Sequence, residues 1–159
     1  MVAASSPMLA VENLVVEYPG KPPKRAVDDV AFSVDAGESV GIVGGSGSGK
    51  TTIAKALVGL EPAVSGRIVF EGVDLLALEP ATRRNARRGM QLVFQDTLGA
   101  LNPRMRVGDA LREVLAVHRR DEFPSRASMD ACAEGLLDLV ELQPDVLRRF
   151  PHEISGGQR

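Results

Sequence analysis

The apolar residues of this chain follow two spacings, which together predict an α/β fold. Runs rich in β-branched or aromatic residues predict strands at 9–16, 26–34, 39–43, 67–70 and 90–94, and those at 39–43 and 90–94 are expected to be buried. Apolar residues at helical spacing predict a helix over 50–59, and a short helix is expected over 81–88. The pattern thus begins with antiparallel strands and continues into an α/β core.

Beyond Val107 the pattern becomes helical throughout, which predicts a small helical subdomain. Two apolar faces follow each other there, at 107–115 and 129–140, and Ser128 is the expected N-cap of the second helix. We therefore expect three parts: a flexible N-terminus over 1–8, the β subdomain with the core over 9–96, and the helical subdomain over 97–159.

A glycine-rich loop at Gly44–Thr51 matches the pattern G-x-x-x-x-G-K-[ST] at every fixed position, and it lies between a predicted strand and a predicted helix. Its four glycines let successive N–H groups turn inward at a helix N-terminus and form a nest that suits a polyphosphate. Lys50 would add a cation for the β- and γ-phosphates, and the Thr51 hydroxyl would coordinate Mg²⁺. The alternative is a flexible turn with an unrelated lysine, which the flanking strand and helix disfavour.

Three other polar or aromatic features have two interpretations each. Tyr18, the only tyrosine, ends a predicted strand, where it either packs in the core or stacks on a planar ligand. Gln95 ends another, where it either caps a turn or holds a metal ion, and Asp96 follows it. Ser155, Gly156 and Gly157 offer backbone donors that either cap a helix or meet an anion.

The composition is that of a globular domain, with 159 residues, 44% hydrophobic and 25% charged. A net charge of −2 gives no general attraction to nucleic acid, and the sharpest basic cluster, Arg83, Arg84, Arg87 and Arg88, is interpreted as one solvated helix face. No apolar run approaches the roughly 18 residues that span a bilayer, and residues 1–9 do not resemble a signal peptide. We therefore expect any association with a membrane to depend on a partner protein.

Taken together, the residues from Leu9 to Arg159 resemble the nucleotide-binding domain of an ATP-binding-cassette (ABC) transporter. Gly44–Thr51 resembles the Walker A loop of that family, Gln95 its Q-loop glutamine, and Ile154–Gln158 its signature motif. The three occur in the family's order, and the signature motif is not a feature of kinases, GTPases or helicases. The resemblance implies that Tyr18 stacks on adenine.

The resemblance also implies ATP and Mg²⁺ as ligands and assigns roles by position. Lys50 and Gln95 would be catalytic, and Thr51 and Gln95 would hold the metal. The nucleotide-binding residues would be Tyr18, Gly44, Gly45, Ser46, Gly47, Ser48, Gly49, Lys50, Thr51, Thr52, Ser155, Gly156, Gly157 and Gln158. The last four would reach a nucleotide held by the opposite subunit of a head-to-tail dimer.

A finer resemblance, to the ATPase subunits of dipeptide, oligopeptide and nickel importers, rests on residues 94–96, 98–105 and 150–153. It implies an energy-coupling ATPase of peptide-type import at the cytoplasmic face of the cell membrane. The implied partners are a second nucleotide-binding domain, transmembrane permease subunits and, indirectly, a substrate-binding protein, with no nucleic acid.

Chemistry in this family also needs a Walker B strand ending in aspartate, a catalytic glutamate, a D-loop and a switch histidine, all after the signature motif. Ile68–Glu71 lacks the Asp-Glu pair, and His152 precedes the signature. We therefore expect a P-loop NTPase core that is incomplete at the C-terminus and inactive by itself. Two alternatives remain open: a nucleotide-binding fragment without turnover, and a non-transport ABC protein acting on ribosomes or DNA.

Overall fold

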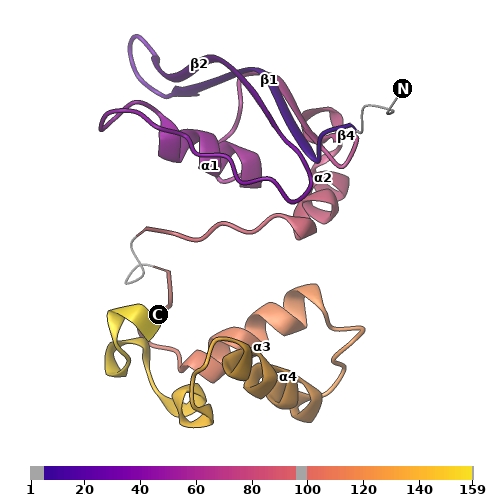
Figure 1. Ribbon diagram of the computed structural model, residues 1–159, viewed down its shortest axis with the longest axis vertical. Coiled ribbons are helices and arrows are strands. Elements are labelled where there is room, and N and C mark those ends of the chain that lie inside the picture. Colours follow the sequence, from indigo (N-terminus) through magenta and orange to yellow (C-terminus); the bar gives the residue numbers. More distant parts are fainter. Residues whose placement is uncertain (1–5, 96–99, 159) are drawn as a thin grey trace. The chain divides into compact units, whose positions relative to one another are not determined.

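A computed structural model describes residues 6–95 and 100–158, and the chain divides into two compact units, 1–92 and 93–159 (Figure 1). Several sequence features lie outside the described residues. These are residues 1–5 of the expected flexible N-terminus, Asp96 of the expected polar pair, residues 98 and 99 of the importer resemblance, and Arg159.

The first unit contains an antiparallel sheet with the strand order β2-β1-β3-β4. Its strands are β1 (Leu9–Tyr18), β2 (Lys24–Val34), β3 (Ser65–Phe70) and β4 (Val73–Asp74). β1 pairs with β2 on one edge and with β3 on the other, so the predicted antiparallel start is confirmed. The short β3–β4 pairing confirms the hairpin expected after Phe70.

The helix α1 (Lys50–Val58) packs beside this sheet in Figure 1, because its apolar side joins the sheet in one core. Leu14 and Val16 of β1 and Ile68 of β3 are completely buried there, next to Ile53 and Ala56 of α1. The helix ends at Gly59, whose φ of 82° is left-handed and whose N–H donates to the carbonyl of Ala56. The predicted helix and its glycine cap are therefore both confirmed.

The prediction of buried strands at 39–43 and 90–94 was wrong. Neither segment forms a strand, and Val43 and Val93 are 95% and 86% exposed. A strand exists only when a neighbour satisfies its N–H and C=O groups, and within the described residues no segment pairs with either run. The prediction of burial rested on apolar composition alone, and no described segment covers these two runs.

The arginine cluster lies on α2 (Pro80–Ala86) and the 3₁₀ turn Arg87–Gly89, close to the predicted helix. The expectation of a single solvated face was wrong for two of its members. Arg83 donates to the carbonyls of Leu76 and Leu78, in and just after the 3₁₀ turn Leu75–Ala77, at 3.0 and 2.7 Å. Arg87 is half-buried, and desolvation together with the nearby Arg83 charge lowers its pKa. Only the other two arginines of the cluster are exposed.

The second unit contains the contacting helices α3 (Val107–His118) and α4 (Arg126–Leu139), followed by 3₁₀ turns at Pro144–Arg148, Pro151–Glu153 and Gly156–Gln158. This confirms the predicted helical stretch. The N-cap of α4 is Ser125 rather than Ser128, since Ser125 accepts from the Ser128 N–H at 3.1 Å while Ser128 Oγ accepts from the Ser125 N–H. Both serines fit a capping pattern, and the helix begins at the earlier one.

The core of the second unit brings α3, α4 and the turns together around Val107, Leu137, Val146 and Ile154. Within the described ranges, no helix has the length and apolarity that crossing a bilayer requires.

Candidate nucleotide-binding site

The glycine-rich loop is held against β2 at its end. Gly49 has a φ of 91°, and a Cβ on it would lie 2.3 Å from the carbonyl oxygen of Ala26. Gly47 is also left-handed, with a φ of 77°. Only glycine allows both the left-handed backbone and the close approach to β2 at position 49. This glycine of the motif is therefore required by the backbone conformation of the loop.

The first turn of α1 faces the loop with open backbone donors. The N-cap residue is Gly49, which has no side chain that could accept from these N–H groups. Its carbonyl accepts from the N–H of Ile53 at 2.9 Å, which is the first hydrogen bond of the helix. The N–H groups ahead of Ile53 have no carbonyl one turn earlier to meet. This helix start therefore offers the donors and the positive dipole end that bind anions.

The Lys50 side chain folds back over the loop. Its Nζ donates to the carbonyls of Gly44 and Gly45 at 2.8 and 2.7 Å, and Ser48 Oγ lies 3.5 Å away. These hydrogen bonds connect the end of the loop to its beginning. They also hold the ammonium where the sequence pattern predicts a phosphate-binding cation.

Tyr18 stands at the end of β1 and is half-buried. Its hydroxyl lies 3.2 Å from Oγ1 of Thr52, a buried residue in the first turn of α1. The ring is therefore anchored next to the loop.

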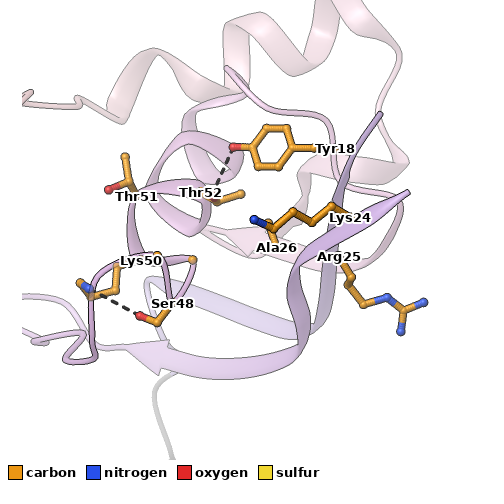
Figure 2. Close-up of a pocket in the computed structure, with 10 residues that line it drawn as sticks. Tyr18, Lys24, Arg25, Ala26, Ser48, Lys50, Thr51 and Thr52 are labelled. Atoms are coloured by element: carbon orange, nitrogen blue, oxygen red, sulfur yellow. Dashed lines mark hydrogen bonds between the residues drawn. The ribbon is translucent and has the colours of Figure 1, made fainter. Parts of the chain in front are cut away.

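These elements surround one cavity of about 380 Å³, within the range of ~300–1,000 Å³ typical of small-ligand pockets (Figure 2). Its lining consists of Tyr18, Lys24, Arg25, Ala26, Gly47, Ser48, Gly49, Lys50, Thr51 and Thr52. The structure thus brings Tyr18 together with the second half of the loop. Gly44, Gly45 and Ser46 belong to the same loop and do not line the cavity.

The sequence analysis missed three lining residues, Lys24, Arg25 and Ala26, because it gave none of them a role in the site. The signal was present in the hairpin, since a turn at 19–23 between two antiparallel strands sets residue 24 opposite Tyr18. Arg25 forms ion pairs with Glu17 and Asp28 at 3.0 and 2.9 Å. These hydrogen bonds raise its pKa.

The remaining predicted site residues belong to the second unit. Gln95 is exposed in a bend. The stretch Ser155–Gln158 is also exposed and closes on itself, because the Gln158 N–H donates to the Ser155 carbonyl at 3.0 Å and Gln158 Oε1 accepts from the Ser155 N–H at 3.1 Å. Ile154, just before it, is buried and anchors the turn.

A family model described as ABC transporter matches residues 27–159 of this chain. The chain belongs to the ABC transporter family. The match contains the loop, Gln95 and the turn at 155–158, so it covers most of the features on which the resemblance was based.

Relatives within the family carry peptide-transport names. A putative peptide import ATP-binding protein of Brucella ovis is 39% identical over 155 residues, 97% of this chain and 48% of that protein. The oligopeptide transport ATP-binding protein OppF is 45% identical in Streptococcus mutans, over 85% of this chain and 43% of the relative. OppF of Escherichia coli K12 is 39% identical, over 87% and 41%. This chain therefore spans about half the length of these relatives.

The fold matches solved cassettes. The chain is similar to the ATP-binding cassette MJ0796, in a dimeric post-hydrolysis state bound to ADP and Pi, with a TM-score of 0.79 and 24% identity over 95% of this chain and 65% of that one. A second dimeric structure of MJ0796, a bacterial ABC transporter cassette, matches with the same values. The expected α/β cassette fold is therefore confirmed.

Proposed function

We propose that this chain forms the nucleotide-binding part of an ATPase subunit that powers peptide import. The observation that carries the proposal is the cavity at the start of α1, where an anchored aromatic ring and a glycine loop with open N–H donors line the same space. Relatives at 39–45% identity named for peptide and oligopeptide transport support the choice of cargo class.

In this proposal the base of ATP stacks on Tyr18, and its phosphates bind the loop amides and the first turn of α1. Lys50 exchanges its contacts with the loop carbonyls for contacts with phosphate oxygens, which are stronger acceptors because they carry full charge. Lys50 then neutralises charge at the phosphates while water attacks in line, so its contribution is electrostatic.

The residues present fit a magnesium ion that is bound mainly through the nucleotide. The Thr51 hydroxyl is exposed and lines the cavity, and no group of three or more carboxylate, histidine or cysteine side chains suited to a metal occurs in the described part of the chain. Mg²⁺ commonly takes only one or two protein ligands in addition to phosphate oxygens and water. We propose Thr51 as one of those ligands from its place in the cavity, and Gln95, which belongs to the second unit, from the family resemblance alone. The bound ion would supply charge neutralisation at the phosphates.

The proposal extends to partners. The exposed turn at Ser155–Gln158 would contact the nucleotide of a second nucleotide-binding domain in a head-to-tail dimer. Transmembrane permease subunits would bind this dimer at the cytoplasmic face of the membrane, and a substrate-binding protein would act through them. The dimeric structures solved for the similar cassette MJ0796 support the dimer.

We further propose that the 159 residues bind ATP without turning it over, because the Asp-Glu strand end and switch histidine that the resemblance requires are not among them. Mg²⁺-dependent phosphate release by the purified 159-residue chain would contradict this part.

Calorimetric titration of the chain with MgATP tests the site. The wild type is expected to bind, and Lys50→Ala to weaken binding roughly 100-fold through loss of its charge-assisted contacts with the β- and γ-phosphates. Lys55→Ala is the matched control, since Lys55 lies in the same helix and outside the cavity lining. Equal affinity of Lys50→Ala and wild type would remove Lys50 from the site.

A further inference from the structure

Lys24 is placed opposite Tyr18 by the register of the sheet. The two residues are Cα partners at the turn end of the β1–β2 ladder, and both line the cavity. In Figure 2 the ammonium end of Lys24 points into the space that Tyr18 and the loop surround, whereas the Arg25 side chain extends away from it. Alternation along β2 accounts for the opposite directions of these neighbours.

Lys24 is also the cation of the cavity whose charge is not already engaged. Arg25 is paired with Glu17 and Asp28, and Lys50 donates to two loop carbonyls. The side chain of Lys24 makes no hydrogen bond or ion pair with any other residue that the structure describes. The lining, which lies entirely within the described residues, includes three basic side chains and no acidic one, so its field favours an anion.

We propose that Lys24 is a second phosphate-binding lysine, which contacts the phosphate next to the ribose, while Lys50 serves the terminal phosphates. This inference rests on the proposed function. Tyr18 marks the base end of the site and the loop marks the phosphate end. The ammonium of Lys24 points into the space that Tyr18 and the loop surround (Figure 2), and the first phosphate is the group that joins the ribose to the phosphates at the loop, so it is the phosphate assigned to Lys24.

The assignment predicts that the effect of Lys24 depends on whether the ligand carries a phosphate. Adenosine has no phosphate and gains nothing from Lys24, whereas AMP already carries the group that Lys24 contacts. ADP and ATP retain that contact and add those at the loop. Lys24 is therefore expected to strengthen binding of AMP, ADP and ATP by a similar factor.

The test is calorimetric or competitive binding of adenosine, AMP, ADP and ATP to the full chain and to Lys24→Gln. We expect Lys24→Gln to weaken the three nucleotides roughly tenfold, with adenosine unchanged, as for loss of one charge-assisted contact. Lys24→Arg should retain most of the affinity. Lys21→Gln is the matched control, because Lys21 is exposed in the preceding turn and does not line the cavity. Fluorescence of Tyr18, the only tyrosine in a chain without tryptophan, verifies folding of each variant.

The outcomes are distinguishable. A wild type that binds no nucleotide overturns the proposed function and this inference with it. A wild type that binds ATP, with Lys24→Gln folded and equal to it for all three nucleotides, overturns the inference alone. An equal loss for adenosine overturns the phosphate contact, because adenosine offers the ammonium no charge.

Discussion

The hydroxyl groups of Tyr18 and Thr52 lie 3.2 Å apart, although the residues are 34 positions apart in the chain. One ends β1 and the other stands in the first turn of α1, so this hydrogen bond ties the aromatic ring to the helix whose N-terminus faces the cavity. The two hydroxyls satisfy each other at a place where Thr52 is buried. The ring is thus held in position before any ligand arrives.

Removing one hydroxyl tests this tie. Tyr18→Phe retains the ring and leaves the buried Thr52 hydroxyl without its partner, so we expect the free energy of unfolding to fall by about 1 kcal/mol. Tyr18→Ala additionally removes the ring, so we expect its ATP affinity to be lower than that of Tyr18→Phe. The difference should be about 1–3 kcal/mol, the range for stacking of a base on an aromatic side chain. Urea unfolding followed by circular dichroism, with calorimetry for ATP, measures both effects.

The control is a double-mutant cycle with Thr52→Val, which retains the shape of the side chain. If the hydroxyls bond to each other, the unfolding energies of the two single variants should not add in Tyr18→Phe/Thr52→Val. Strict additivity would mean that the two hydroxyls act separately.

Gly49 is expected to tolerate no side chain. In Gly49→Ala the methyl group would be forced toward the Ala26 carbonyl while the residue keeps a φ of 91°, so the loop must move away from β2. We expect a loss of about 2–4 kcal/mol in unfolding free energy and a weakened nucleotide site. Tyr18 fluorescence during urea unfolding reports on this unit.

Gly41→Ala is the matched control, because nothing lies within 4 Å of a Cβ there and its φ is outside the left-handed region. Its stability should stay close to that of the wild type. A comparable loss in both variants would show that glycine content in general, rather than the contact with Ala26, decides stability.

The helical unit should lose stability in acid through Asp109. The hydrogen bond from Arg112 holds the pKa of Asp109 below its usual value of 3.8. A carboxylate whose pKa is lower in the folded chain binds fewer protons there than in the unfolded chain, so it stabilises the fold above the unfolded-state pKa. This contribution disappears as the pH falls below about 4 and through the lowered value.

We therefore expect Asp109→Asn to be less stable than the wild type at pH 7 and the difference to shrink as the pH falls below about 4. Helical circular dichroism during urea unfolding at a series of pH values follows this unit. Glu113→Gln serves as the control, since Glu113 lies on the same helix and forms no ion pair within the described residues. A constant gap between Asp109→Asn and wild type across the pH range would argue against the ion pair with Arg112.

Local chemistry was sufficient for several elements of this protein. The loop at 44–51, the helix that follows it and its glycine cap were predicted because glycine backbone freedom, helical spacing and capping act within a few residues. The β1–β2 pairing was predictable for the same reason, as a hairpin depends on the turn and on alternation in adjacent strands.

Tertiary structure decided the rest. The apolar runs at 39–43 and 90–94 have strand composition, yet a strand forms only where another segment supplies its hydrogen bonds, and that depends on distant chain. Likewise, no local rule brings the Thr52 hydroxyl to Tyr18, because their contact follows from the packing of a helix on a sheet. The sequence by itself determined the glycine-rich loop, whereas only packing and register decided that Tyr18 and Lys24 share its cavity.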